Sequence, residues 1–420
     1  MCSSDLAWPE FMPDGQSVLF TVIPQTSTDG ARIVVLNLRT RESEIVLNGA
    51  TAARYAATGH LLYVSGQRLN AIAFDPKTLE KRGETIAVPA ITIATARDNG
   101  AAEFVVSATG TLLYVAPRAP VARTVSWVDR KGVREPLALT LGPNLYNVPR
   151  ISPDGTRVAL DMFSGDGNRD IWIWSLERQS LTKLTTGLSE ELVPLWTPDS
   201  RRVFFASNRA GALDIYSQAA DGASDAEVEF AGEGTQLPMS FTPDGARVIV
   251  SGNFREIGVL DLARPDRIKP LLRGEFTLGL GEVSPDGRWI AYESDESGNQ
   301  FEIYLRPFPD VDAQREKISI AGGRYPRWNR QGNDELFYVN LDGAMMAASV
   351  QLSPSLELGP VTKLFDGVRP PTFVSGNQYD ISPIDGRFLV VANVATPGES
   401  TTISVVLNWF EELRELVPLR

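Results

Sequence analysis

Short apolar runs separated by polar bends recur along the whole chain. Residues 157–160 and 170–174 are two such runs, rich in β-branched and aromatic residues and joined by a polar bend. A third run, residues 149–151, precedes a tight turn, and a fourth, residues 181–184, follows a second bend. Runs of this length and composition, bounded by turn residues, predict β-strands. The same order recurs downstream, so the pattern predicts four strands in roughly every 45 residues.

A Pro-Asp-Gly turn marks each unit of this pattern. Copies at residues 153–155, 198–200, 243–245 and 285–287 are spaced by 45, 45 and 42 residues, with Ser200 in place of the glycine in the second, and residues 13–15 form another. Proline presets φ, aspartate bonds back to the backbone, and glycine takes the left-handed conformation. The aspartates are therefore expected to be structural rather than catalytic. They are Asp14, Asp154, Asp199, Asp244 and Asp286. Degenerate copies lie at residues 58–59, 109–110, 331–332 and 385–386, which brings the units to nine.

Repeated four-stranded units of this length predict a β-propeller. A β-sandwich also has many short strands, but it has no reason to repeat one turn at constant spacing. We predict an all-β fold of four-stranded antiparallel blades. The expected arrangement is a seven-bladed ring over residues 99–410, with residues 8–96 forming two blades of a truncated upstream propeller. A single eight- or nine-bladed ring is the alternative.

The two ends of the chain have their own features. Residues 1–6 read as the translation of a common sequencing adapter, so we expect residues 1–7 to be a non-native leader; a natural polar terminus is the alternative. Residues 408–420 predict a short helix and tail. Asn408 is the expected N-cap, with Glu411 at the capping-box position. Leu413 and Leu416 are expected to pack against a blade.

Composition excludes several classes of function. The net charge of −12 argues against a nucleic-acid or anionic-membrane partner, because an acidic surface repels phosphate. With one cysteine, Cys2, and one histidine, His60, no Cys/His zinc site or disulfide can form. The sequence has neither a nucleophile elbow around a serine nor a phosphate-binding loop. We therefore expect no enzymatic activity, metal or cofactor in this chain. No apolar run approaches the length of a membrane span.

The turn and its flanking strands resemble the TolB-like, WD-related propeller repeat, over residues 8 to about 409. Residues 8–15, 284–298, 304–309 and 404–409 are more narrowly similar to the C-terminal propeller region of bacterial membrane-anchored serine/threonine protein kinases. The resemblance implies an extracytoplasmic location and an attached kinase domain in the intact protein. Units two and three depart from the pattern, because their turns lack Pro-Asp.

The innermost strand of each blade faces the axis of a propeller, and a fixed position before each turn should point into the channel. The residues at this position are Glu10, Arg54, Val105, Arg150, Leu195, Ser240, Glu282, Arg327 and Asp380. Both charge signs are present, which fits a polar funnel for a ligand or a water-filled channel whose charges pair. The loops entering these strands add tyrosines, which are enriched in binding sites. The predicted ligand-binding residues are Tyr146, Arg150, Glu282, Tyr325, Arg327, Tyr379 and Asp380.

Two other groups of residues are candidate sites. Asp161, Asp166, Asn168 and Asp170 superficially resemble a calcium loop, but equivalent bends lack the ligands, so a hairpin is expected. His60 abuts a degenerate turn and is predicted to lie at the surface or at a strand edge, without a catalytic role.

Two functions fit this sequence. The first is a non-enzymatic sensing or scaffold propeller, part of a larger signalling protein, that binds a protein, peptide or small polar ligand. The second is the gating propeller of a prolyl-oligopeptidase-type serine peptidase whose catalytic domain lies outside this chain. Fold alone does not choose the ligand.

Overall fold

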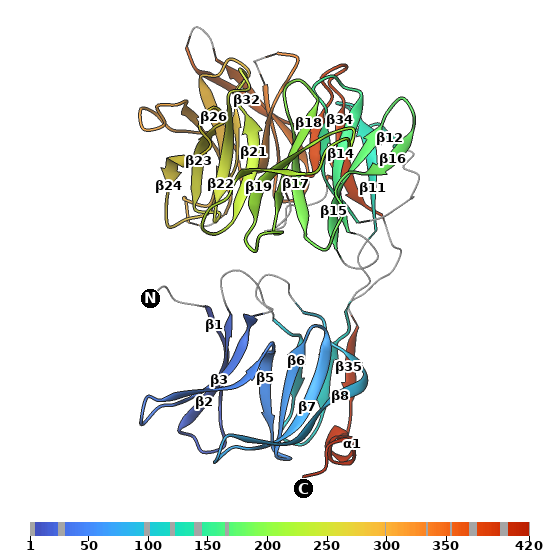
Figure 1. Ribbon diagram of the computed structural model, residues 1–420, viewed down its shortest axis with the longest axis vertical. Coiled ribbons are helices and arrows are strands. Elements are labelled where there is room, and N and C mark those ends of the chain that lie inside the picture. Colours follow the sequence, from blue (N-terminus) through green and yellow to red (C-terminus); the bar gives the residue numbers. More distant parts are fainter. Residues whose placement is uncertain are drawn as a thin grey trace. The chain divides into compact units, whose positions relative to one another are not determined.

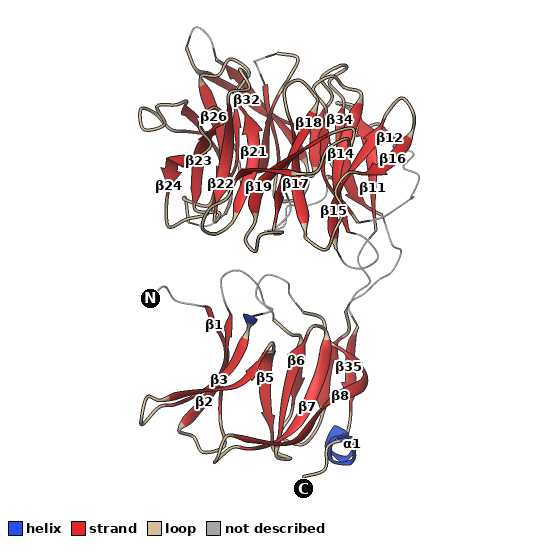
Figure 2. Ribbon diagram, viewed as in Figure 1, coloured by secondary structure: helices blue, strands red, loops and turns tan. Residues whose placement is uncertain are grey.

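The computed structural model describes residues 5–23, 30–95, 101–117, 122–137, 145–163, 168–298, 300–332, 335–352, 355–368, 376–394 and 402–419. These residues are almost entirely β-strand, with one helix near the C-terminus, as Figure 2 shows. The chain divides into two compact units. Residues 121–395 form the ring unit, and residues 1–120 with 396–420 form the terminal unit, which contains both chain ends. The all-β prediction is confirmed.

Within the described residues of the ring unit, the strands form six four-stranded antiparallel sheets (Figure 1). Five of them use consecutive strands. The first sheet holds β13 (Tyr146–Ile151), β14 (Arg157–Phe163), β15 (Arg169–Ser175) and β16 (Ser180–Lys183). The second holds β17 (Glu191–Trp196), β18 (Arg202–Ser207), β19 (Asp214–Ala219) and β20 (Glu227–Phe230). The third holds β21 (Gln236–Phe241), β22 (Arg247–Gly252), β23 (Glu256–Asp261) and β24 (Ile268–Arg273). The fourth sheet holds β25 (Leu278–Val283), β26 (Trp289–Ser294), β27 (Glu302–Pro307) and β28 (Glu316–Lys317). The fifth holds β29 (Arg324–Trp328), β30 (Glu335–Val339), β31 (Met345–Gln351) and β32 (Glu357–Phe365).

The remaining sheet of the ring unit joins two distant parts of the chain. Its strands, from the axis outward, are β33 (Tyr379–Ile381), β34 (Phe388–Asn393), β11 (Arg123–Val128) and β12 (Arg134–Pro136). The inner strands contact one another in series from β13 to β29, and β33 contacts β13. The Tyr379 hydroxyl donates to the Tyr325 carbonyl at 2.8 Å, which links β33 to β29. The ring is therefore closed.

The expected seven-bladed ring over residues 99–410 is wrong. The third repeat supplies β9 (Phe104–Val106) and β10 (Leu112–Val115), but β10 pairs with β35 (Ile403–Val406) rather than with β11. Strand β11 pairs with β34 instead. The two repeats thus exchange their outer strands. Turn spacing cannot reveal this exchange, because pairing of residues almost 300 apart leaves no mark on the local pattern.

Four inner strands of the ring unit carry a bulge with a positive-φ residue two positions before the axial residue. Val148, Val193, Leu280 and Tyr325 all have positive φ, between 38° and 64°, and the pairing register shifts around each of them. A non-glycine residue rarely takes this conformation unless its surroundings impose it. Carboxylates of the preceding sheet supply such contacts. Asp161 Oδ2 accepts from Val193 N at 3.2 Å, and Glu293 Oε2 accepts from Tyr325 N at 2.9 Å.

The turn aspartates have the structural role that the repeat predicted. In each complete copy, a carboxylate oxygen accepts from the backbone N–H two residues later: Thr156, Arg201, Ala246, Arg288 and, at the first copy, Gln16. The hydroxyl of Thr197, two residues before the aspartate, also donates to Asp199 at 2.7 Å. This hydrogen bond, the largest cause, lowers the pKa of Asp199 from 3.8.

Replacing Asp154 by alanine is expected to lower the free energy of unfolding of the ring unit by about 1 kcal/mol, because hydrogen bonds within the turn are lost. Chemical denaturation of the variant measures the change. Asp225→Ala is the matched control, since Asp225 is exposed and lies outside a turn motif. Equal effects of the two substitutions would contradict the structural role of the turn aspartates.

Among its described residues, the terminal unit holds three sheets in succession. They are β1 (Asp5–Phe11), β2 (Ser17–Ile23), β3 (Arg32–Asn37) and β4 (Ser43–Asn48); β5 (Thr51–Ala56), β6 (His60–Ser65), β7 (Arg68–Asp75) and β8 (Glu80–Thr92); and β9, β10 and β35. The described strands β1 to β8 thus form two four-stranded sheets, and a third sheet belongs to the same unit. That these sheets are blades of an upstream propeller stays a prediction. Residues 1–4 of the expected leader lie outside the described residues.

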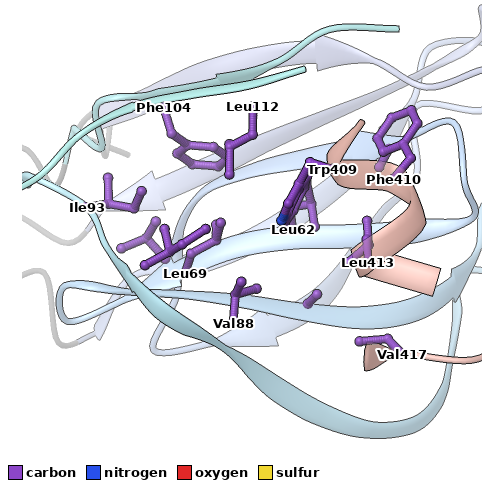
Figure 3. Packing of buried hydrophobic residues seen from close by; sticks show 14 of the residues in the cluster. Leu62, Leu69, Val88, Ile93, Phe104, Leu112, Trp409, Phe410, Leu413 and Val417 are labelled. Atoms are coloured by element: carbon purple, nitrogen blue, oxygen red, sulfur yellow. The ribbon is translucent and has the colours of Figure 1, made fainter. Parts of the chain in front are cut away.

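Helix α1 (Trp409–Leu416) packs against the second and third of these sheets (Figure 3). Trp409, Phe410 and Leu413 are buried among Leu62, Phe104 and other strand residues, and Leu416 packs at the edge of this cluster. The predicted contact of Leu413 and Leu416 with a blade is confirmed. The predicted capping box is wrong, because Asn408 has a left-handed backbone, φ 56°, and its side chain makes no cap hydrogen bond.

Candidate functional site

The six inner strands of the ring unit bring four charged residues together at its axis, among the residues described. Arg327 Nη1 lies 2.9 Å from Glu282 Oε1, and its Nη2 lies 3.6 Å from Asp380 Oδ1. Arg150 is close enough to Asp380 and Glu282 that both carboxylates affect its pKa. The repeat position therefore predicted correctly that Arg150, Glu282, Arg327 and Asp380 face one another.

These axial side chains also bind neighbouring strands to one another. Asp380 Oδ2 accepts from the backbone N–H of Ile151 at 2.8 Å, and Glu282 Oε2 accepts from that of Trp328 at 3.3 Å. The Trp196 indole donates to the Arg150 carbonyl at 2.9 Å. Part of the charge cluster is thus structural, and a ligand would use the groups that remain accessible.

A cavity of about 280 Å³ lies beside this cluster, at the turn end of the inner strands. Arg150, Glu282, Arg327 and Arg330 line it, and prolines of the repeated turns surround it: Pro153, Pro198 and Pro243. Sequence reasoning missed Arg330, which lies three residues after Arg327 in the turn that follows β29. Its side chain is 28% exposed and pairs with Asp380 Oδ1 at 3.3 Å. A basic residue within a degenerate turn was the signal that could have identified it.

Arg150 is the most unusual group in the cavity wall. It is 2% exposed, and among the described residues its Nε atom has no hydrogen-bond partner. With its amide oxygen facing the arginines, Asn377 accepts from Arg150 Nη1 at 3.2 Å and from Arg327 Nε at 2.8 Å. Burial lowers the pKa of Arg150, against the opposing effect of Asp380 and Glu282. A buried donor without a partner favours an incoming acceptor.

The three predicted tyrosines lie elsewhere, which corrects the expected ligand face. Tyr146, Tyr325 and Tyr379 are buried and do not line the cavity, although Tyr379 lies close enough to Arg150, Glu282 and Asp380 that these groups affect its pKa. Burial raises the pKa of Tyr146 to about 12 and that of Tyr379 well above 10. The bulge at Tyr325 and the packing of these rings keep them inside the core, so they are not available to a ligand.

Glu282 titrates near neutral pH. Burial, the largest cause, raises its pKa from 4.5 to about 7, although Arg330 and Arg150 oppose this shift. Between these two values the folded protein holds a proton that the unfolded chain releases. The contribution of Glu282 to stability therefore becomes less favourable as the pH rises from 4.5 to about 7.

Glu282→Gln is expected to remove this dependence, so the stability of the variant relative to the parent should increase between about pH 5 and pH 8. Denaturant unfolding of the ring unit at both pH values measures the difference. Glu256→Gln is the control, since Glu256 pairs with Arg273, an arginine whose side chain is largely exposed. If Glu282→Gln and the parent have the same slope of stability against pH, the raised pKa is wrong.

The side chains of the other candidate groups, where described, have structural partners. Asp161 pairs with Arg169 at 2.8 Å, and Asp170 pairs with Lys183 at 2.8 Å. Asp166 lies outside the described residues, and no group of three or more potential metal ligands occurs within them. His60 is buried, which corrects its expected surface position: Nε2 lies 2.6 Å from the Val417 carbonyl and Nδ1 lies 2.9 Å from the Thr58 hydroxyl. No local pattern around His60 indicates that the C-terminal segment covers it.

The axial residues of the terminal unit do not form a comparable charged cluster among its described residues. Arg54 Nε lies 3.4 Å from Glu10 Oε2, and Val105, the third predicted axial residue, is exposed.

Comparisons with known proteins agree with this architecture. Residues 131–267 match the family described as the TolB beta propeller domain. A peptidase of Bacillus subtilis, YuxL, is 23% identical over 37% of this chain and 31% of its own length. A protein of Agrobacterium fabrum is 26% identical over 29% of this chain and 46% of its own. The chain thus spans less than half the length of these curated relatives.

A solved TolB structure from Agrobacterium tumefaciens has a similar fold. Its TM-score is 0.54 at 19% sequence identity, and the match covers 66% of this chain and all of that one. The resemblance to kinase-attached propellers stays an expectation. The protein carries a TolB-like β-propeller built from four-stranded antiparallel blades.

Proposed function

We propose that the ring unit is a binding module whose axial cavity takes a carboxylate, the C-terminus of a peptide or a small organic acid. The observation that carries this proposal is Arg150, a buried guanidinium that lines the cavity and whose Nε has no hydrogen-bond partner among the described residues. Three guanidinium groups face two carboxylates there, so the balance of charge favours an anion. Arginine binds carboxylates with paired, charge-assisted hydrogen bonds.

The size of the cavity supports a small group rather than a folded partner. About 280 Å³ lies at the lower end of the range for ligand sites, which suits a terminal residue or a metabolite of similar size. A protein partner would therefore enter by its chain end.

A second candidate is the gating propeller of a serine peptidase. The similarity to the YuxL peptidase favours it, since this chain matches about a third of that protein. In that case the cavity would bind peptide ends on their way to a catalytic domain outside this chain.

No helix among the described residues could cross a membrane. An extracytoplasmic position with an attached kinase domain rests on the resemblance of residues 8–15, 284–298, 304–309 and 404–409 alone.

Arg330→Gln is expected to weaken binding of free-carboxylate tripeptides about tenfold or more, because one charge-assisted contact is lost. A library of tripeptides, with each sequence also made as its C-terminal amide, supplies the probes, and calorimetry measures affinity. Lys269→Gln is the matched control, which removes a positive charge from the exposed outer strand β24.

The proposal requires that the amides bind more weakly than the acids and that only Arg330→Gln changes affinity. Equal binding of acids and amides would contradict it. Equal losses from Arg330→Gln and Lys269→Gln would instead indicate a general electrostatic effect.

A further inference from the structure

The axial cavity of the ring unit has a charged side and an apolar side, among the residues described. On four inner strands, β13, β25, β29 and β33, the axial position holds one of the charged residues of the cluster. On the other two, β17 and β21, the same position holds Leu195 and Ser240. Strands β17 and β21 contact each other and follow one another around the ring. The uncharged positions therefore lie together on one side of the cavity.

Apolar side chains line the cavity on this side. Leu195, Trp196 and Pro198 come from the sheet that begins with β17, and Phe241 and Pro243 come from the sheet that begins with β21. We call these five residues the apolar arc. Pro198 and Pro243 are exposed, whereas Leu195 and Trp196 are buried. The apolar arc thus continues from the turns at the surface into the interior of the ring unit.

The polar side chains on this side of the cavity already have partners within the protein. The Ser240 hydroxyl donates to a backbone carbonyl of β25 at 3.0 Å, and the Trp196 indole donates to the Arg150 carbonyl at 2.9 Å. The Thr242 hydroxyl donates to the Asp244 carboxylate. A polar ligand group placed against the apolar arc would give up its hydration to apolar side chains, which is costly. The apolar arc therefore favours an apolar group.

Arg150 lies next to the apolar arc. Its strand, β13, contacts β17, so a carboxylate bound to the Arg150 guanidinium has Leu195 on the neighbouring strand. Elsewhere around the ring, the carboxylates of Glu282 and Asp380 disfavour a second negative group on the ligand. A single carboxylate beside an apolar substituent is therefore the chemistry that matches both sides of the cavity.

We propose that the axial cavity selects carboxylates that carry an apolar side chain close to the carboxyl group. A leucine or a similar aliphatic residue at the C-terminus of a peptide has this chemistry, and so does a branched aliphatic acid. The carboxylate contacts Arg150 and Arg330, and the side chain packs on the apolar arc. This inference rests on the proposed carboxylate site, and it adds the chemical class of the group that accompanies the carboxylate.

Tripeptides that differ in their last residue test this selection on the unaltered chain. The last residue is leucine, asparagine or glycine after two glycines, and each peptide is made as the free acid and as the C-terminal amide. By calorimetry, the leucine acid should bind about tenfold or more tightly than the asparagine acid, which has a similar shape but must give up its hydration. 4-Methylpentanoate has the leucine skeleton without the amide. Binding as tight as that of the leucine acid would identify a free acid as the ligand, and weaker binding a peptide C-terminus.

The amides separate a failure of this inference from a failure of the carboxylate site. Equal affinities of the leucine, asparagine and glycine acids, all above those of their amides, would overturn this inference while supporting the carboxylate site. Equal affinities of the leucine acid and its amide would contradict the carboxylate site itself. Absence of binding by every acid would contradict both.

Leu195→Ala tests the apolar arc directly. The ratio of the affinities of the leucine and glycine acids should fall about fivefold, because the leucine side chain loses apolar contact and glycine has none to lose. Leu260→Ala is the matched control, since Leu260 is buried in the same apolar cluster as Leu195 but does not line the cavity. Denaturant unfolding shows that both variants are folded. A folded Leu195→Ala variant with the parent ratio would overturn the proposal, as would equal losses from the two substitutions.

Discussion

Arg327→Met is expected to destabilise the ring unit by about 3–5 kcal/mol, the usual cost of removing one partner from a buried ion pair. Arg327 is buried, and it lies 2.9 Å from Glu282 and 3.6 Å from Asp380. Methionine leaves these carboxylates short of a cation in a place that water reaches poorly. Arg330 retains its contact with Asp380, so the larger loss falls on Glu282.

Denaturant unfolding followed by tryptophan fluorescence measures this change, and the transition of the ring unit is the one that should shift. Arg273→Met is the matched control, because Arg273 pairs with Glu256 at 2.7 Å with its side chain 68% exposed. That substitution should cost less than about 1 kcal/mol. Adding Glu282→Gln to Arg327→Met should recover part of the loss, since the uncompensated charge is removed. A loss below about 1 kcal/mol from Arg327→Met would contradict a structural role for the pair.

The sequence predicted the blades because the information that defines them is local. Apolar runs with a period of two residues predict where the strands lie. The turn that contains Asp154, and its equivalents in other repeats, connects the first two strands of a blade. The number of blades in the ring depended instead on whether β10 pairs with β11 or with β35. All three are short apolar strands, so residue pattern cannot choose between the two pairings. Packing across the whole fold decides this.

The positions of the axial charged residues could also be predicted from local sequence information. The positions of the tyrosines could not. Arg150 and Arg327 occupy a fixed position after the bulge in their strands, so the repeat alone aligns them. Tyr325 is itself the bulge residue, with a positive φ of 64°. Non-glycine residues rarely adopt this conformation, so the sequence does not predict it. The bulge alters the alternation of side chains along the strand. A residue expected at the rim therefore enters the core.

Trp409→Ala is expected to destabilise the terminal unit by about 3–5 kcal/mol, the typical cost of removing a buried aromatic side chain. Trp409 is fully buried between the second and third sheets, and its backbone N–H donates to the Gly110 carbonyl at 2.8 Å (Figure 3). The Cβ position of Gly110 faces the ring of Phe410, so helix and turn are in close contact. Loss of the indole leaves a cavity that these neighbours can fill only in part.

Hydrogen exchange measured by mass spectrometry distinguishes a local effect from a global one. Trp409→Ala should reduce protection of β5 to β8, β10 and β35, and leave β17 to β20 of the ring unit unchanged, because each unit has its own core. Leu419→Ala in the same C-terminal segment is the control, since Leu419 is exposed and its loss should have little effect. Equal loss of protection in both units would show that they unfold together. Because β35 returns to the terminal unit only after the ring unit is complete, unchanged protection of β10 and β35 would mean that the helix does not hold this returning strand in place.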